Sequence, residues 1–331
     1  MAFTSVSNST SKSLPPSQEP PKKRKNREWT GAAIALAIGV AGLCLGRLGF
    51  LWIRFDVFSQ FSIQFLFLAL AAVLAMALPR FKGLFAIVGF IVLICLYGIW
   101  PHFLKTGPEG ALADGEKRLR VAQFNAHSEN PKHDEMIAMV RALNPDVMTL
   151  VEFAPSSKPV LEGLKADYPY QVTCWDVEGC DFAIISKTPL DIVKLRRNRE
   201  MPAFLHASLG PEFGNLNVLA VHTTRFPFAV TQFKQVNAFA KYLELTPGAL
   251  LVMGDFNATP FSRVIQSFTQ NVGLTRQTLL PSWPSQLDLP QLAIDHIFTS
   301  AGIRALGQET IGDNAGSDHY PVALTLAVPG K

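Results

Sequence analysis

Charged residues are almost absent from three long stretches in the first third of this 331-residue sequence. The stretches span residues 31–53, 57–78 and 84–104, and Arg47 is the only Lys, Arg, Asp or Glu within them. Each has about the 20 residues that an α-helix needs to cross a bilayer. Three such blocks in succession disfavour the buried helices of a globular core, and they are too long and too many for a cleaved signal peptide. We therefore expect residues 30–104 to form a transmembrane anchor of three helices.

Positive charge outside these blocks is distributed unevenly. A basic run, residues 22–27 (KKRKNR), precedes the first block, and Arg80 and Lys82 lie between the second and the third. Since Lys and Arg concentrate on the cytoplasmic side of a membrane, the N-terminus is expected in the cytoplasm, as a disordered basic tail over residues 1–29. Three crossings then place the rest of the chain outside the cytoplasm. This predicts a multi-pass protein of a cell membrane, such as a bacterial inner membrane with a periplasmic domain.

The remainder of the chain has no excess of basic residues. Residues 1–104 hold ten Lys/Arg and three Asp/Glu, a net charge of +7, whereas residues 105–331 hold twenty and twenty-three, a net charge of −3. A slightly acidic domain argues weakly against a general nucleic-acid binder, which usually has a basic surface. Its only basic cluster is residues 194–199 (KLRRNR). A solvated hairpin is the first interpretation of this cluster, and a grip on a phosphate-rich substrate or on anionic lipid is the alternative.

Cysteine is scarce, with four residues in the chain, and two of them lie in the apolar blocks. Cys174 and Cys180 bracket a short loop. In an oxidising compartment, this arrangement favours a disulfide over two separate buried thiols. A zinc site is disfavoured because no second Cys/His pair follows at the usual spacing.

Residues 105–117 are rich in Gly and charge and are expected to be a linker, followed by one domain over residues 118–331. Strands and helices alternate in this domain, which predicts an α/β (α+β) fold with layered sheets. We find no internal repeat. The expected strands cover residues 119–124, 146–151, 168–173, 182–185, 216–221, 249–253, 292–298 and 321–326, and the expected helices cover 134–143, 160–166, 226–245 and 263–269.

Polar residues suited to metal or phosphate chemistry follow several of these strands. Taken singly, each has an ordinary structural explanation, such as a turn, a helix cap or a solvated loop. Their joint occurrence at strand ends, where α/β folds place their chemistry, indicates a functional site. The residues are Asn125, Glu152, His222, Asp255 with Asn257, and Asp318 with His319.

Six segments resemble, in order, the motifs of the endonuclease/exonuclease/phosphatase superfamily, which has the deoxyribonuclease-I-like fold. They are RVAQFNAH, LVEF, VHTTRF, GDFNATP, IDHIFTS and SDHYPV, and the similarity covers roughly residues 117–328. The resemblance implies a four-layer α/β/β/α sandwich with its site at one edge of the paired sheets. It also implies cleavage of phosphoester bonds that depends on a divalent metal, Mg²⁺ or alternatively Mn²⁺.

The resemblance also implies a metal site. Glu152 would be the main Mg²⁺ ligand, Asn125 would position the metal or the phosphate, and Asp318 would bind the metal or lie close to it. The sequence departs from the family at His127, where many nucleases have an acidic residue, and at His296, where an aromatic residue is common and a structural role is expected.

The catalytic roles implied by the resemblance fall on five residues. Asp255 would deprotonate the attacking water, and Asn257 would donate a hydrogen bond to a phosphoryl oxygen. His319 would stabilise developing charge, with its ring oriented by Asp295, and His222 would contact the phosphate.

The sequence thus predicts a membrane-anchored, Mg²⁺-dependent phosphoesterase with a phosphoester substrate and the bilayer as its partners. Three alternatives remain: a nuclease acting on extracytoplasmic DNA or RNA, a phosphodiesterase of phospholipid head groups, and an inactive binding module. The last is disfavoured because the residues needed for chemistry are all present.

Overall fold

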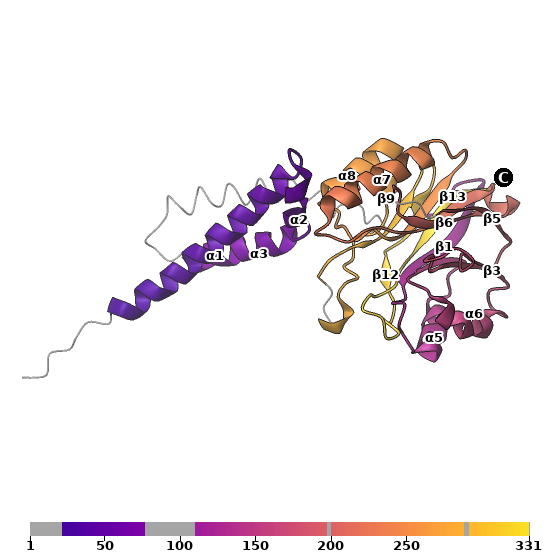
Figure 1. Ribbon diagram of the computed structural model, residues 1–331, viewed down its shortest axis with the longest axis horizontal. Coiled ribbons are helices and arrows are strands. Elements are labelled where there is room, and N and C mark those ends of the chain that lie inside the picture. Colours follow the sequence, from indigo (N-terminus) through magenta and orange to yellow (C-terminus); the bar gives the residue numbers. More distant parts are fainter. Residues whose placement is uncertain (1–21, 77–109, 197–199, 288–290, 331) are drawn as a thin grey trace, which may run out of the picture.

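The computed structural model describes residues 22–76, 110–196, 200–287 and 291–330, and it contains an N-terminal helical hairpin and a domain with two β-sheets (Figure 1). The third apolar block, most of the predicted tail, the first part of the linker and residues 197–199 of the basic cluster lie outside the described residues.

The hairpin pairs α1 (Lys22–Leu48) with α3 (Ser62–Met76). Its tip contains a 3₁₀ turn (Ile53–Phe55) and α2 (Asp56–Ser59). The two long helices approach closely because Gly39 and Gly42 face the other helix, where an added Cβ would lie within 3 Å of Ala69 or Phe65.

Among the described residues, one continuous helix, Thr30–Leu48, is long and apolar enough to cross a membrane. The second apolar block is not a single helix as predicted. It is divided into two segments, Ile53–Ser59 and Ser62–Leu74, that bend by 58° and pass the same test only together. The polar side chains at this bend contact the sheet domain. In addition, α1 begins at Lys22, inside the tail that we expected to be disordered.

The first sheet of the domain has the strand order β11-β13-β1-β2-β4-β3, and β12 also pairs with β13. β1 runs parallel to β2 and antiparallel to β13. The connection from β1 to β2 contains α5 (His133–Leu143), and α6 (Lys158–Leu164) follows β2. The strands are β1 (Glu116–Asn125), β2 (Val147–Val151), β3 (Tyr170–Thr173), β4 (Phe182–Ser186), β11 (Arg304–Ala305), β12 (Thr310–Ile311) and β13 (Val322–Pro329).

The second sheet has the order β5-β6-β7-β8-β10-β9. β7 and β8 are parallel and are connected through α7 (Ala229–Glu244), and α8 (Arg263–Val272) follows β8. Its strands are β5 (Leu190–Arg196), β6 (Ala203–Leu209), β7 (Leu216–His222), β8 (Leu250–Asp255), β9 (Thr275–Arg276) and β10 (Asp295–Thr299). Short 3₁₀ turns occupy Pro155–Ser157, Pro211–Phe213 and Ser285–Leu287.

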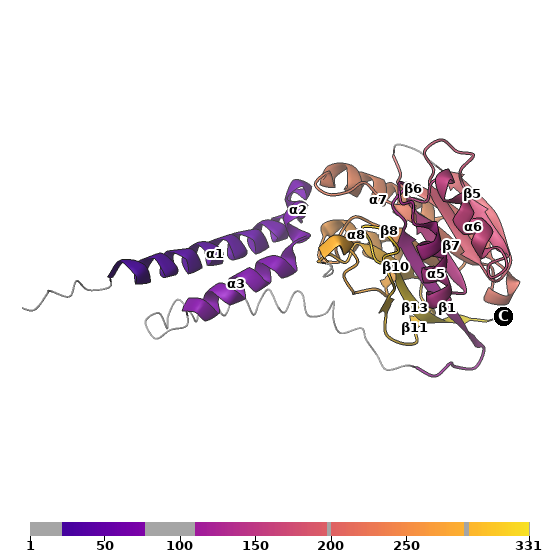
Figure 2. The same cartoon turned by 90° about the horizontal axis from the view of Figure 1, so that it is seen from below.

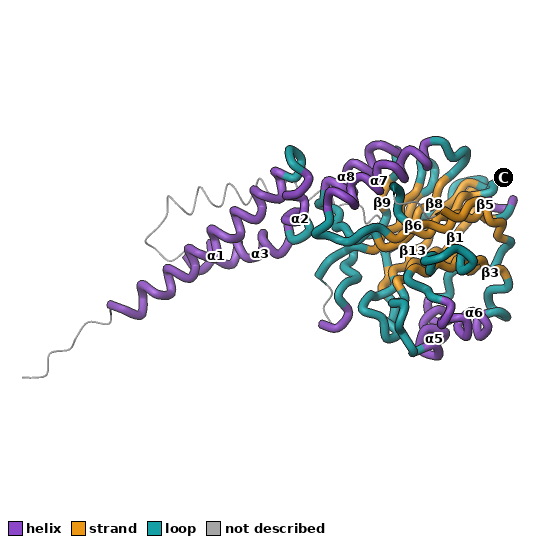
Figure 3. The backbone as a smooth tube through the Cα atoms, viewed as in Figure 1, coloured by secondary structure: helices purple, strands orange, loops and turns teal. Residues whose placement is uncertain are grey.

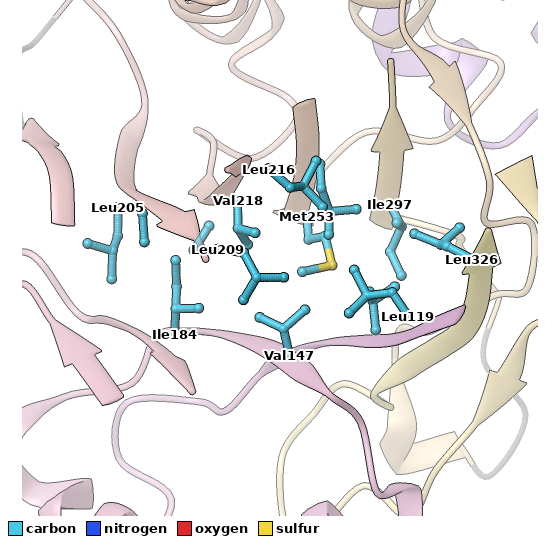
Figure 4. Close-up of a cluster of buried hydrophobic side chains, with 14 of the residues drawn as sticks. Leu119, Val147, Ile184, Leu205, Leu209, Leu216, Val218, Met253, Ile297 and Leu326 are labelled. Carbon is cyan, nitrogen blue, oxygen red and sulfur yellow. The ribbon is translucent and has the colours of Figure 1, made fainter. Parts of the chain in front are cut away.

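The main hydrophobic core lies between the two sheets (Figure 4). Leu119 and Val147 of the first sheet meet Val218 and Met253 of the second. The outer face of the first sheet packs on α5 and α6, and that of the second packs on α7 and α8 (Figure 3). Because the central strands are buried on both faces, they appear in the sequence as continuous apolar runs.

Two local findings bear on the sequence predictions. Cys174 and Cys180 form the predicted disulfide, with their Cα atoms 5.6 Å apart. β5, which contains the described part of the basic cluster interpreted as a hairpin, pairs antiparallel with β6. Neither was predicted as a strand, and the apolar pattern of β6 is interrupted by His206. Its ring is buried, and its two nitrogens lie 2.7 Å from the Tyr242 hydroxyl and 2.9 Å from Oδ1 of Asn217.

Candidate active site

The polar residues that follow the strands meet at one edge of the two sheets. Asn125 ends β1 and Glu152 follows β2, and since these strands are parallel their carboxyl ends lie together. Asp255 ends β8 in the second sheet. Nδ2 of Asn125 donates to Oε1 of Glu152 and to Oδ2 of Asp255, at 3.1 Å in both cases. This single amide therefore joins carboxylates from both sheets.

Gly254 allows β8 to lie close to the neighbouring strand β7, next to Asp255. A Cβ at Gly254 would lie 1.9 Å from the carbonyl oxygen of Val221 in the neighbouring strand β7. No other residue fits this close approach, which explains the glycine of the GDFN motif.

Asp255 is the centre of the hydrogen-bond network and is only 1% exposed. Its Oδ1 accepts from the backbone N–H of Asn257 at 2.7 Å, and its Oδ2 accepts from Nδ2 of Asn257 at 3.2 Å. Asn257 has a left-handed backbone with φ 46°, which turns its side chain back toward the aspartate. Burial, together with the charge of Asp295, raises the pKa of Asp255 to about 6, against the opposing effects of His319 and His222.

His319 and Asp295 form a buried pair beside Asp255. Asp295 begins β10 and pairs directly with Asp255 in the sheet. Nδ1 of His319 donates to Oδ2 of Asp295 at 2.8 Å, while its Nε2 lies 3.8 Å from Oδ2 of Asp255. Burial alone would lower the pKa of His319, but the charge and hydrogen bond of Asp295, together with the charges of Asp255 and Asp318, outweigh it and raise the pKa to about 10. At neutral pH His319 is therefore an imidazolium, which donates hydrogen bonds and does not accept protons.

Two clusters of acidic residues and histidine lie among the described residues, and Glu152, His222 and Asp255 form the more accessible one. One ligand atom from each lies within 4.8 Å of the others, and the same holds for Asp255, Asp295 and His319. In the second cluster, the positive charge of the His319 ring already offsets the negative charge of Asp255 and Asp295. In the first, Nε2 of His222 lies 3.4 Å from Oε1 of Glu152, and both side chains are about 30% exposed. The partly exposed carboxylate of Glu152, beside the neutral amide of Asn125, suits a hard cation such as Mg²⁺, which keeps several waters.

Asp318 belongs to neither cluster. Its Oδ2 accepts from Nε1 of Trp283 at 3.2 Å, and its Oδ1 lies 3.7 Å from Nδ1 of His127. Its predicted role at the metal therefore has no support from these contacts, although it lies on the wall of the same cleft. His296 is a structural residue, as expected. Burial lowers its pKa to about 3, and Nε2 of this neutral ring donates to the carbonyl of Ala258 at 2.8 Å.

A cleft of about 730 Å³ lies over these residues. It is lined by Glu152, His222, Asp255, Asn257 and His319. One wall is the loop 223–228. Its last three residues, 226–228, were predicted as the start of a helix, but α7 begins only at Ala229. Trp283, Ile294 and Asp318 line the other side.

Three residues that support the site were not identified from the sequence. The Ser282 hydroxyl donates to Asp295. Ser317 donates to the carbonyl of Asn125, which fixes the last loop to β1. Nε2 of Gln232 donates to the carbonyls of Phe256 and Asn257. The only available signal was a polar glutamine on the otherwise apolar face of α7.

Comparison with solved structures shows the fold. The chain matches an endonuclease/exonuclease/phosphatase from Beutenbergia cavernae with a TM-score of 0.51 and 20% identity, covering 65% of this chain and 72% of the other. It matches a family protein from Bacteroides thetaiotaomicron (TM-score 0.54, 14% identity, 64% and 98% covered). A mannosyl-6-phosphatase from the same organism gives a TM-score of 0.52 at 16% identity, with 63% and 99% covered.

No curated protein matches the chain significantly. The sequence profile of the endonuclease/exonuclease/phosphatase family matches residues 122–319, more than half of the chain and all of the strand ends that carry the site. This chain therefore belongs to the endonuclease/exonuclease/phosphatase family.

Proposed function

We propose that this protein hydrolyses phosphoester bonds with the help of a divalent cation, Mg²⁺ in the first instance and Mn²⁺ as the alternative. The observation that supports this most is the convergence at Asn125. Its amide holds the carboxylates of Glu152 and Asp255 together, next to the imidazolium of His319. Family membership supports phosphoester hydrolysis in general.

Glu152 would hold the cation, with Asn125 positioning its carboxylate. The residues present fit such an ion, because Glu152 and Asp255 offer oxygen ligands within 4.8 Å of each other and no thiolate is nearby in the described residues. When bound, the cation would act as a Lewis acid on the phosphoryl oxygens. Asp318, which lines the same cleft, would act on the cation through a bound water.

Of the remaining residues, one would act on the attacking water and the others on the phosphate. Asp255, with a pKa of about 6, is ionised at neutral pH and would take a proton from the attacking water. His319 would stabilise the charge that develops on phosphorus oxygens, with Asp295 keeping its ring charged and oriented. Asn257 and His222, whose Nδ2 and Nε2 lie 3.1 Å apart, would contact the phosphate.

The domain would act from a membrane anchor over residues 30–104, with the N-terminus in the cytoplasm and the cleft outside it. Thr30–Leu48 is the helix that supports this arrangement best. Trp52 lies just after it, is 53% exposed, and has the character of a residue at a membrane–water interface.

A phospholipid head group is the substrate class that one observation favours over nucleic acid. The cleft wall 223–228 reaches the hairpin tip, where the rings of Phe226 and Phe61 meet edge to face at 5.7 Å. Phe228 on the same wall is 59% exposed. An apolar cleft mouth next to the end of a membrane hairpin would receive a lipid phosphodiester more readily than duplex DNA, which the slightly acidic domain would repel.

The test is turnover by the full chain in detergent, with bis-p-nitrophenyl phosphate and Mg²⁺. We expect hydrolysis that a chelator abolishes and that Mg²⁺ restores. Absent or chelator-insensitive turnover would contradict the proposal. A panel of phospholipid vesicles, single- and double-stranded DNA, RNA and a sugar phosphate then identifies the substrate class, and hydrolysis of nucleic acid alone would exclude the phospholipid assignment.

A further inference from the structure

The tip of the N-terminal hairpin, residues 49–64, packs against the sheet domain beside the candidate active site. Figure 2 shows the hairpin ending against the domain near α8. The tip contacts three loops of the domain. Each loop directly precedes or follows a strand that carries a site residue.

The first loop follows Asp255 and Asn257 and ends at α8. Oδ1 of Asp56 accepts from the backbone N–H of Arg263, the first residue of α8, at 2.8 Å. Oε1 of Gln60 accepts from the backbone N–H of Thr259 at 2.6 Å. Both side chains from the hairpin are 1% exposed. A carboxylate at a helix N-terminus satisfies a free N–H and interacts favourably with the helix dipole.

Arg263 makes the reciprocal contact. Its Nη1 donates to the carbonyls of Gly49 at 3.2 Å and Phe50 at 2.8 Å, just beyond the end of α1. The guanidinium also stacks over the ring of Phe233 in α7 at 4.9 Å. The hairpin therefore accepts a hydrogen bond from the first backbone N–H of α8, while the Arg263 side chain of α8 donates to two backbone carbonyls just beyond the end of α1.

The other two loops adjoin β10 and β7. Nε2 of Gln64 donates to the carbonyl of Gln291, upstream of Asp295 at the start of β10. Phe61 stacks edge to face on Phe226, in the loop that follows His222 and lines the cleft. One short segment outside the matched family domain thus contacts the loops that follow Asp255 and His222 and the loop that precedes Asp295.

We infer that the hairpin tip is a positioning element of the active site, in which Asp56 and Gln60 fix the loop that carries Asn257. That loop has no ladder of strand or helix hydrogen bonds between Phe256 and Ser262, and it includes the left-handed turn at Asn257. The hairpin accepts the hydrogen bonds of two backbone N–H groups here, that of Thr259 within the loop and that of Arg263 directly after it. Because the anchor supplies these acceptors, the active site is complete only when the hairpin is docked. The catalytic part of this inference rests on the proposed function.

The test uses the full chain in detergent with Asp56→Ala and Gln60→Ala, and with Asp191→Ala as the control, since Asp191 is an exposed carboxylate on β5 far from the tip. The first readout is amide hydrogen exchange. We expect residues 256–264 to exchange about tenfold faster in both variants, because a backbone donor loses its partner, with no change in the control. Asp56→Asn keeps an acceptor at the same position and should restore most of the protection. Unchanged exchange in both alanine variants would overturn the inference, whether or not the protein is an enzyme.

The second readout separates positioning from simple tethering. Where the wild type hydrolyses bis-p-nitrophenyl phosphate with Mg²⁺, we expect Asp56→Ala to lower kcat by about tenfold with KM within about twofold, since a misplaced catalytic group slows chemistry more than binding. Faster exchange with an unchanged kcat would mean that the tip only holds the domain, and would overturn the positioning role. Absence of turnover in the wild type itself would instead count against the proposed function and leave the exchange result to decide the inference.

Discussion

Asp295→Asn is the substitution that tests the electrostatics of the site most sharply. It keeps the shape of the side chain and an acceptor for Nδ1 of His319, now 2.8 Å from Oδ2 of Asp295, while removing the negative charge. Against the opposing effect of burial, the charge and hydrogen bond of Asp295, with smaller contributions from the charges of Asp255 and Asp318, raise the pKa of His319 from 6.5 to about 10. Each pKa unit corresponds to about 1.4 kcal/mol, so the surroundings favour the charged ring by roughly 5 kcal/mol. His319 is almost fully buried, which leaves little solvent screening.

The consequence is a change in the pH dependence of activity. The proposed role of His319 requires its proton, so activity in the wild type should be lost as the pH rises through the folded-state pKa near 10. In Asp295→Asn, burial should dominate and bring the alkaline limb of kcat/KM down by about two pH units or more. The assay is the pH profile of the full chain with saturating Mg²⁺, with Asp191→Asn as the matched control.

Stability gives an independent readout of the same pair. The folded-state pKa of His319 lies above its unfolded value, so its contribution to the free energy of unfolding is complete below about pH 6.5 and is lost between there and about pH 10. With chelator present, the Tm of the wild type should fall over this window, and that of Asp295→Asn should fall less. An alkaline limb and a Tm profile that are identical in the wild type and the variant would refute the assignment of His319 as an imidazolium held by Asp295.

Three further predictions concern the packing at Gly254, the disulfide and the membrane topology. Gly254→Ala should destabilise the fold by more than about 4 kcal/mol, because the new Cβ would lie 1.9 Å from the Val221 carbonyl oxygen. The measurement is loss of folded protein or a large fall in Tm. A variant with the wild-type Tm would contradict the close approach of β7 and β8. Replacing Cys174 and Cys180 by Ser should lower the free energy of unfolding by about 2 kcal/mol, as expected for a disulfide closing a short loop, and a reducing agent should then have no further effect on Tm. In a bacterial host, a C-terminal alkaline phosphatase fusion should be active and a fluorescent-protein fusion dark, and the opposite result would reverse the proposed topology.

The sequence predicted those parts of the fold that depend on local patterns. The apolar runs before Glu152, His222 and Asp255 are strands because each is buried on both faces, and the residues after them meet at one sheet edge. The disulfide was predictable because its cysteines are near one another in the sequence. The β6 strand was missed because buried His206 is satisfied by Tyr242 and Asn217, which no local pattern reveals.

The contacts of the hairpin tip could not be predicted for a similar reason. Asp56 and Gln60 were expected in or next to a second transmembrane helix, yet their partners Arg263 and Thr259 lie 207 and 199 residues further along the chain. Hydrophobicity identifies an apolar block, but it does not show that polar side chains at a bend will find partners in another part of the chain. The metal role that the motif indicated for Asp318 stays a prediction, since its contacts are with Trp283 and His127.

The most direct test of the proposed chemistry is the turnover number of Asp255→Asn in the full chain at saturating Mg²⁺. Asn keeps the size of the side chain and an acceptor for the Asn257 N–H, but it cannot take a proton from water. A positioned general base contributes about 10²–10⁴-fold to a rate, so we predict a loss of kcat of that size in a variant that still folds, which its Tm checks. A folded Asp255→Asn variant with the wild-type kcat would contradict the assignment of Asp255 as the base.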